Sequence, residues 1–331
     1  MTAAIASNTS WSDGGLRRYE ARRDMAALAK LIETAFGERL DESGRRMIQE
    51  MRLLGRAGWL GWLLSRWLLP PMAHPYGFVW EVDGKLVGNA SLLPVEQFRH
   101  RWVLANVAVT PKERGKGIAG RLVDASIDFA RRKGARKLIL QVDAGNERAL
   151  TLYHHRSFTV TTTRTVWTAH GTPRALNDVD AGLTRQRNVD EWRAQWALAK
   201  RLHPEGLIWP YPTVSSIFRP RGTKRWLSLG PDRHFVWVEE GHLAGSVSLR
   251  HSSQPGVWRI VLIVEPEYRG RIEASLLSAA LESYRDTQWG YLLEYPHDAA
   301  EEALRELGFR ARRTLTWMSR SIDRVDFEEE Q

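Results

Sequence analysis

The feature that most constrains the fold of this chain is an internal repeat. The segment FVWEVDGKLVGNASL (Phe78–Leu92) matches FVWVEEGHLAGSVSL (Phe235–Leu249) at eight of fifteen positions, without a gap. Both segments alternate strand-forming residues around an acidic residue and a glycine, which predicts a β-hairpin in each. The offset between them is 157 residues. A period of this length indicates duplication of a whole domain, because solenoid repeats are much shorter.

Two further pairs of segments extend the repeat, and the offset between the copies decreases along the chain. VAVTPKERGKGIAG (Val107–Gly120) matches LIVEPEYRGRIEAS (Leu262–Ser275) at an offset of 155. YHHRSF (Tyr153–Phe158) matches LRELGF (Leu304–Phe309) at an offset of 151. The same order of segments in both halves predicts two tandem copies of one fold.

The domain boundaries follow from the repeat and from the composition between its copies. We predict a disordered tail at 1–15, which lacks the basic and apolar regions of a signal peptide. The first domain is predicted over 16–170 and the second over 172–323, with a linker at Gly171–Asp178. A length of 331 residues suits two domains of ordinary size.

Each copy is predicted to have a mixed α/β (α+β) fold, with antiparallel strands first and a βαβ unit after them. Apolar runs predict buried strands, and apolar periodicity with capping residues predicts helices. A second helical region, from about Leu40 to Leu69, would end at Pro70. The other expected elements, beside the hairpins, are strands Leu16–Arg23, Trp102–Val109 and Lys137–Asp143, and helices Met25–Phe36 (capped by Asp24), Gly117–Lys133, Asn146–His155 and Asp190–Leu202.

Composition narrows the partners and the chemistry. The chain has no cysteine, which excludes disulfides and thiolate catalysis and suits a cytoplasmic protein. Its net charge of +9 suits an anionic ligand, but the charges are scattered. The one dense run, Arg131–Lys137, is typical of a solvated helix end, so we predict no nucleic-acid partner. No HExxH motif is present, so we predict no metal site.

The segment Arg52–Met72 is very apolar and carries three arginines. It is too short and too charged for a membrane span, so we predict no stable membrane insertion. We favour a buried helix, either beside a ligand-binding site or at the domain interface, over a helix lying on a membrane surface.

A basic, glycine-rich loop follows the first buried strand and leads directly into a helix. The loop is Arg114-Gly115-Lys116-Gly117. Glycines let the main chain approach a ligand closely. The unpaired N–H groups and the dipole at a helix start favour phosphate, and the two basic side chains add positive charge. The expected ligand is therefore a pyrophosphate.

Gly115, Gly117 and Gly120 also fit the GxGxxG pattern of dinucleotide-binding proteins, with Asp143 ending the next strand. We do not favour this interpretation. Five residues separate the strand end from the first glycine, where that pattern expects a tighter turn. The loop is also basic, and a hairpin precedes the unit instead of a parallel strand.

The same loop resembles the acetyl-CoA motif of the GNAT superfamily of acetyltransferases. In VAVTPKERGKGIAGRLV the motif's positions are filled by Arg114, Gly117 and Ala119. The resemblance covers 16–170 and implies a mixed α/β fold. It also implies transfer of an acetyl group from acetyl-CoA to a primary amine of a small molecule or peptide by direct attack, without a metal.

The downstream stretch NERALTLYHHRSF resembles the next motif of that family, an Asn-x-x-Ala-x-x-Leu-Tyr pattern before an aromatic residue. Its positions are filled by Asn146, Ala149, Leu152 and Tyr153. Ser157 stands where the family usually has glycine, which should alter only the turn.

The resemblance implies how acetyl-CoA would be held. Loop amides would hold the pyrophosphate, and the edge of Val107–Val109 would pair with the pantetheine arm. A backbone N–H near Val109 would stabilise the oxyanion. Asn146 would bind the pantetheine or cap its helix. The implied cofactor-binding residues are Val107, Ala108, Val109, Arg114, Gly115, Lys116, Gly117, Ile118, Ala119, Gly120, Asn146 and Tyr153.

The catalytic groups are implied less completely. Tyr153 would act as the general acid for the departing thiolate, or would simply pack in its helix. For the general base we favour Glu96 over Glu81, Asp143 and a chain of waters. The acceptor, the size of the acyl group and the oligomeric state, a homodimer included, stay open. The alternative function is a CoA-binding regulatory module without catalysis.

Three parts of the implied site are absent from the second copy in a gapless alignment. The differences are Gly117 to Ile272, Tyr153 to Leu304 and Asn146 to His297. A β-branched side chain at the first position would stand where the main chain has to meet phosphate. We therefore predict that the second copy is degenerate: it keeps the fold and has lost acetyl-CoA chemistry.

Overall fold

The computed structural model describes residues 15–37, 45, 48–53, 76–171, 183–220, 232–252, 254, 256–283 and 289–322. The predicted tail, the linker after Gly171 and the apolar segment beyond Leu53 lie outside these residues. The chain forms two compact units. Unit 1 holds the described residues up to Leu140, Leu152–Phe158, and those from Ser319 onward; unit 2 holds Gln141–Thr151 and Thr159–Met318.

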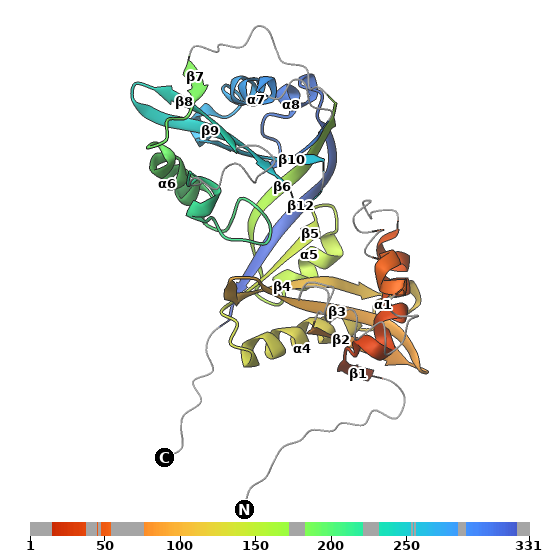
Figure 1. Ribbon diagram of the computed structural model, residues 1–331. Coiled ribbons are helices and arrows are strands. Elements are labelled where there is room, and N and C mark those ends of the chain that lie inside the picture. The colour runs from red at the N-terminus through yellow and green to blue at the C-terminus, as the bar shows by residue number, and fades with distance from the viewer. Residues whose placement is uncertain are drawn as a thin grey trace, which may run out of the picture. The chain divides into compact units, whose positions relative to one another are not determined.

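Among the described residues, five neighbouring strands form the sheet of unit 1, and the last three residues of the fifth belong to unit 2 (Figure 1). The five strands are β1 (Gly15–Arg18), β2 (Tyr76–Val82), β3 (Lys85–Val95), β4 (Phe98–Val109) and β5 (Lys137–Asp143), in that order. The first three pairings are antiparallel, and β4 pairs with β5 in parallel. The predicted mixed α/β fold, with antiparallel strands before a βαβ unit, is confirmed.

Two long helices, α1 (Ala21–Phe36) and α4 (Ile118–Arg132), pack on this sheet, and both contact β3 (Figure 1). Five consecutive residues of β3, Gly88–Leu92, are buried, so both faces of the strand are covered. A Cβ on Gly88 would lie 3.0 Å from Ile118 Cγ2 and 3.0 Å from Leu122 Cδ1. Glycine at this position therefore lets α4 lie close to the sheet.

The first helix begins earlier than the sequence predicts. We expected a strand to Arg23 and a helix capped by Asp24, but β1 ends at Arg18 and α1 begins at Ala21. Asp24 lies inside the first turn, where its carboxylate accepts the Glu20 N–H at 2.8 Å. It also accepts two hydrogen bonds of 2.7 Å from the Arg17 guanidinium. This buried ion pair sets the start of the helix, and strand propensity does not reveal it.

Unit 2 contains the remaining strands and, among the described residues, several helices (Figure 1). Its strands are β12 (Arg310–Ser321, whose last residues belong to unit 1), β6 (Thr159–His170), β11 (Gly290–Pro296), β10 (Val257–Val264), β9 (His242–His251), β8 (Arg233–Glu239) and β7 (Thr184–Gln186), in this spatial order. The helices are α6 (Trp192–Leu202), α7 (Glu273–Glu282) and α8 (Glu301–Glu306), with 3-10 turns at Ser215–Ile217 and Pro266–Tyr268. Both predicted hairpins, β2–β3 and β8–β9, are present.

The strand β6 belongs to the first sequence copy, but it lies between two strands of the second. It pairs antiparallel with β11, from Arg164 opposite Pro296 to His170 opposite Gly290. On its other side, Thr161 Oγ1 donates to the Trp317 carbonyl of β12 at 3.1 Å. The sheet of unit 2 is thus built from both halves of the sequence.

A half-buried histidine is expected to make unit 2 sensitive to acid. His203 follows α6, and its Nδ1 accepts a hydrogen bond of 2.9 Å from Arg164 Nη2. Burial, together with the charges of Arg164 and Arg269, lowers the pKa of His203 from 6.5 to about 3. Between pH 6.5 and about 3, this histidine is protonated in the unfolded chain but neutral in the folded chain. Its contribution to stability is therefore complete above pH 6.5 and falls as the pH drops towards 3.

We expect the free energy of unfolding to fall by about 1 kcal/mol more in the wild type than in His203→Asn between pH 7.5 and 5.5. The asparagine Oδ1 can still accept the hydrogen bond from Arg164 but does not titrate. Urea unfolding at the two pH values measures the difference. An equal loss in both proteins would contradict the assignment.

Candidate functional site

The predicted phosphate loop lies between β4 and α4 in unit 1. A 3-10 turn, Pro111–Glu113, follows β4, and Arg114 Nε donates to the Val109 carbonyl at 3.1 Å. Gly115 and Gly117 then have φ angles of 84° and 78°, in the left-handed region that favours glycine. A Cβ at either glycine would meet nothing within 4 Å among the described residues. The loop is thus shaped by backbone conformation, and the space beside both glycines is open.

The start of α4 leaves main-chain donors available. Gly117 is the N-cap residue, and no side chain in the described part of the chain caps it. The first N–H groups of a helix have no intrahelical partner, and the helix dipole makes them favourable for an anion. The Ile118 side chain is buried against the sheet, so this residue offers only its amide. Lys116 Nζ is largely exposed and pairs with Glu113 at 2.9 Å.

The second turn of α4 is held by a neighbouring arginine. Arg156 makes ion-pair contacts of 2.7 and 3.1 Å with Asp124. A Cβ on Gly120 would lie 2.4 Å from its guanidinium, so a larger residue would require the end of the Arg156 side chain to move. Gly120 therefore has a packing role here, whatever its amide contributes.

The edge of β4 beyond Val103 is not paired with β5. The parallel register joins Arg101–Val103 to Lys137–Ile139, and no further pairs are formed between the described residues of these strands. Val107 is half-buried, while Ala108 and Val109 are buried. The main-chain donors and acceptors on this edge of β4 therefore have no partner on β5 among the described residues.

A bulge interrupts β4 at the same place. Ser91 pairs with Ala105 and Asn89 pairs with Ala108, so Ala90 alone faces both Asn106 and Val107. Asn106 has a φ of 53°. Sequence reasoning missed this bulge and the two asparagines beside it. Its signal was one part of the fall in the offset between the copies, from 157 at the hairpin to 155 at the loop. The bulge accounts for one residue of that fall, and the turn between β3 and β4 accounts for the other.

Tyr153, the predicted proton donor, is buried. It lies on α5 (Glu147–His154), is 7% exposed, and its ring centroid is 5.7 Å from that of Phe158. Its hydroxyl makes no hydrogen bond to another described residue. Burial raises the pKa of the Tyr153 hydroxyl above its ordinary value. The group therefore keeps its proton at neutral pH and at moderately alkaline pH.

Asn146 precedes α5 and caps it. Its Oδ1 accepts the Ala149 N–H at 3.3 Å, as the capping interpretation predicts. At the other end of the helix, Ser157 adopts a φ of 59° in the position that Gly308 fills in the second copy with 87°. The serine for glycine exchange therefore leaves the turn intact. Contact of Asn146 with a cofactor stays a prediction.

The structure does not bring Glu96 to the loop. Glu96 is exposed in the turn between β3 and β4, whereas the loop follows the opposite end of β4. Twelve residues of extended strand separate the two ends, which is about 36 Å. Asp143, the last residue of β5, has its carbonyl bonded by the Asn146 N–H at 2.9 Å.

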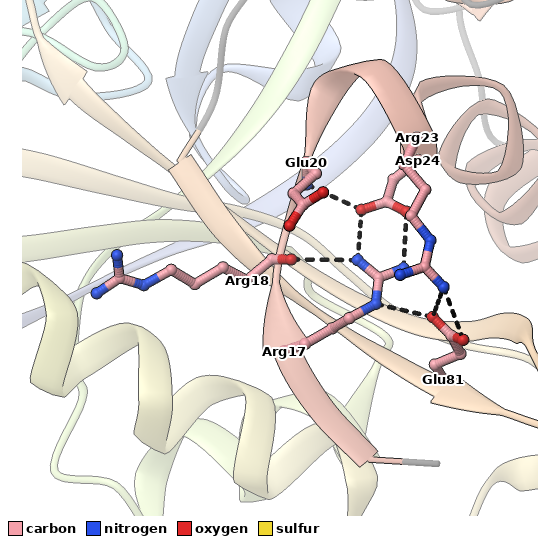
Figure 2. A network of polar contacts seen from close by, with 6 residues as sticks. All are labelled: Arg17, Arg18, Glu20, Arg23, Asp24 and Glu81. Carbon is pink, nitrogen blue, oxygen red and sulfur yellow. Dashed lines mark hydrogen bonds and ion pairs between the residues drawn. The ribbon is translucent and has the colours of Figure 1, made fainter. Parts of the chain in front are cut away.

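The Glu81 carboxylate accepts hydrogen bonds from two arginines in a polar network (Figure 2). It accepts a 2.7 Å hydrogen bond from Arg17 Nε, and bonds of 2.7 and 2.8 Å from Arg23 Nη2. Arg17 in turn holds Asp24, whose carboxylate raises the pKa of the Arg17 guanidinium above its ordinary value. The network joins β1, β2 and α1, so Glu81 has a structural role.

The corresponding loop of the second copy is one residue shorter. A Cβ on Gly88 would meet Ile118 and Leu122, and a Cβ on the matching Gly245 would meet Ile272 and Leu276. Ile272 is thus the counterpart of Ile118, and Gly117 has none. The gapless alignment is wrong at this point. Ile272 is 1% exposed and points into the core of unit 2, because the glycine has been deleted and not replaced.

A carboxylate of the chain itself occupies the shortened loop. Glu273 Oε2 accepts the Gly270 N–H at 2.8 Å, and Glu273 Oε1 accepts the Tyr295 hydroxyl at 2.9 Å. Glu273 is 1% exposed. Gly270 corresponds to Gly115, and its φ of 80° is similar. The second loop therefore already holds an anion at one of its amides.

The tyrosine position of the second copy holds an apolar side chain. The Phe158 N–H donates to the Tyr153 carbonyl at 3.1 Å, and the Phe309 N–H donates to the Leu304 carbonyl at 2.9 Å. These matching bonds make Leu304 the counterpart of Tyr153. Leu304 is fully buried and has no proton to give.

Comparison with known proteins decides the family. The acetyltransferase (GNAT) family model matches residues 44–158 and 196–309, which together exceed half of the chain. The chain belongs to the GNAT family of acetyltransferases. The two matched ranges also confirm the tandem repeat of GNAT domains. Membership points to acyl transfer from an acyl-CoA.

Two curated relatives match part of this GNAT protein. An uncharacterized N-acetyltransferase of Bacillus subtilis is 32% identical over 81 residues, 24% of this chain and 54% of the relative. An acetyltransferase of L-methionine sulfoximine and L-methionine sulfone from Salmonella typhimurium is 33% identical over 105 residues, 31% of this chain and 58% of the relative. The chain thus spans little more than half the length of these relatives, which support an acyltransferase.

A solved structure extends the likeness in fold to most of the GNAT protein. A GCN5-related N-acetyltransferase from Sphaerobacter thermophilus aligns with a TM-score of 0.53 at 17% identity. The alignment covers 92% of this chain and 95% of that one. The two proteins share a fold over nearly their whole lengths.

Where the structure describes the chain, every helix is too short or too polar to cross a membrane. The described residues also contain no group of three or more histidine, aspartate or glutamate side chains arranged to hold a metal ion.

Proposed function

We propose that the protein is an N-acetyltransferase that moves the acetyl group of acetyl-CoA to a primary amine, with its one working site in the first copy. The observation that carries this proposal is the contrast between the two loops. The first has two left-handed glycines and open space beside them. The second lacks the second glycine and binds its own Glu273 carboxylate.

In the proposed site, main-chain groups do most of the binding. The amides from Gly115 to Gly120 would hold the pyrophosphate, with Arg114 and Lys116 adding positive charge. The unpaired edge of β4 would receive the pantetheine arm. A main-chain N–H of the bulge, at Asn106 or Val107, would donate to the thioester oxygen as negative charge develops there.

The proposed reaction is a direct attack. The amine nitrogen bonds to the thioester carbonyl carbon, and the carbon–sulfur bond breaks. Tyr153, which is protonated at neutral pH, then gives its proton to the departing sulfur. The amine must also lose a proton. The positions of Glu96 and Glu81 argue against both, so we propose a chain of waters as the route for this proton.

Titration calorimetry with acetyl-CoA tests the proposal. We expect one molecule to bind per chain, because the loop of the second copy holds Glu273 in place of a phosphate. Two equivalent molecules per chain would contradict the assignment of one site.

Release of the CoA thiol, followed with a panel of primary amines, tests the chemistry. At least one amine is expected to raise the rate above that with water. Binding without any release would favour the regulatory module over the enzyme.

A further inference from the structure

The two copies differ by one residue at the bulge in the central strand. In the second copy, Val247 on β9 pairs with a single residue, Leu262, and the register runs without interruption from Trp258 to Val264. In the first copy, the matching Ala90 faces two residues, Asn106 and Val107. The first copy therefore has one inserted residue here. A bulge re-aims the main-chain groups beside it, and bulges are over-represented next to active sites.

Asn89 holds the inserted residue in place. Its side chain is fully buried, and Nδ2 donates to the Asn106 carbonyl at 2.9 Å and to Ser91 Oγ at 3.0 Å. The counterpart of Asn89 in the second copy is Ser246, on the unbroken strand. The Ser246 hydroxyl is buried without a hydrogen bond in the described part of the chain. A long carboxamide thus stands where the bulge is, and a short hydroxyl stands where it is absent.

The conformation held by Asn89 is costly. Asn106 has a left-handed backbone, with a φ of 53°, inside a strand. Asn89 Oδ1 is buried without a hydrogen-bond donor among the described residues. Both features oppose folding, and the second copy, whose β10 has one residue fewer, shows no positive φ at the matching place among its described residues. Costly conformations of this kind cluster at functional sites.

We propose that Asn89 is a positioning residue for acetyl transfer. Its side-chain amide fixes the carbonyl of Asn106, and thereby the orientation of the adjoining N–H that would donate to the thioester oxygen. This inference rests on the proposed function. It assigns the loss of activity in the second copy to two deletions, Gly117 from the phosphate loop and Asn106 from the bulge.

Asn89→Ser in the full chain tests the role, because the second copy shows that such a strand accommodates serine. We expect CoA, which has no thioester, to bind the variant with an affinity within about twofold of the wild type. The rate of thiol release from acetyl-CoA, with water or an active amine, should fall about 10- to 100-fold, because a small misplacement of a reacting group has effects of that size.

An infrared difference spectrum with acetyl-CoA labelled at the carbonyl carbon reports the hydrogen bond to the thioester oxygen. A general loss of protein stability would not produce the same change in the spectrum. The wild type should lower the carbonyl stretching frequency on binding, because a hydrogen bond weakens the C=O bond. Asn89→Ser should lose most of that shift. An unchanged shift and rate would overturn the proposal, and so would a parallel loss of CoA affinity and melting temperature, which indicates a role in folding alone.

Two further variants separate the contacts of Asn89. Asn89→Asp keeps the shape but loses the donor, so it should be as slow as Asn89→Ser. Ser91→Ala removes the other acceptor and should keep the wild-type rate and carbonyl shift. The opposite pattern, a fast Asn89→Asp and a slow Ser91→Ala, would overturn the proposal. If the wild type binds no acetyl-CoA, the proposed function itself fails.

Discussion

Replacement of Gly117 by isoleucine is expected to weaken acetyl-CoA binding by about 100-fold or more, which is about 2.7 kcal/mol. Gly117 has a φ of 78° and starts α4. A β-branched residue resists that conformation by about 1–2 kcal/mol, so the loop must shift its amides or bear the strain. The new side chain would also fill the open space beside the loop. Calorimetry with acetyl-CoA measures the effect.

The matched control is Gly84→Ile. Gly84 lies in the turn between β2 and β3 with a φ of 70°, and a Cβ there also meets nothing within 4 Å. The two variants should lose similar stability in thermal unfolding, while Gly84→Ile keeps its affinity. Unchanged affinity in Gly117→Ile would remove the loop from the binding site, and an equal loss in both variants would make strain the only cause.

Replacement of Tyr153 by phenylalanine is expected to lower turnover about 100-fold, a typical contribution of a general acid. Phenylalanine keeps the ring that packs at 5.7 Å from Phe158, so the acetyl-CoA affinity should change by less than about threefold. Only the proton donor for the departing sulfur is lost. Thiol release measured at saturating acetyl-CoA, with calorimetry alongside, separates the two quantities.

Tyr19→Phe serves as the control for this second variant. Burial raises the pKa of the Tyr19 hydroxyl as well, and Tyr19 packs in a separate cluster with Leu28 and Ile32. Turnover of this variant should equal that of the wild type. A Tyr153→Phe enzyme as fast as Tyr19→Phe would show that the sulfur obtains its proton elsewhere.

Much of the fold was predictable because it depends on local patterns. Alternating apolar residues around Asp83-Gly84 and Glu240-Gly241 gave both hairpins, and a glycine-rich loop between an apolar strand and an apolar helix face gave the β4–α4 connection. The position of Tyr153 followed from a motif in which every spacing is set by one helix. These features need no knowledge of distant contacts.

The wrong predictions concern features that are set by contacts between residues far apart in the sequence. The start of α1 depends on Arg17 reaching Asp24, and the place of Ile272 depends on its packing against Gly245. The bulge depends on Asn89 binding a carbonyl seventeen residues away. Glu96 was a plausible base on composition, but a turn at the far end of β4 does not serve the loop. A gapless alignment cannot show single-residue deletions, and both differences between the copies are of that kind.

The placement of β6 explains why a silent second copy would persist in the gene. Twelve residues of the first copy, starting six after Tyr153, have β11 and β12 of the second as their neighbours. A mutation that removed the second half would leave those residues as a bare, aggregation-prone edge. Selection for chemistry in the first half would therefore also maintain the strands of the second, whatever the second loop binds.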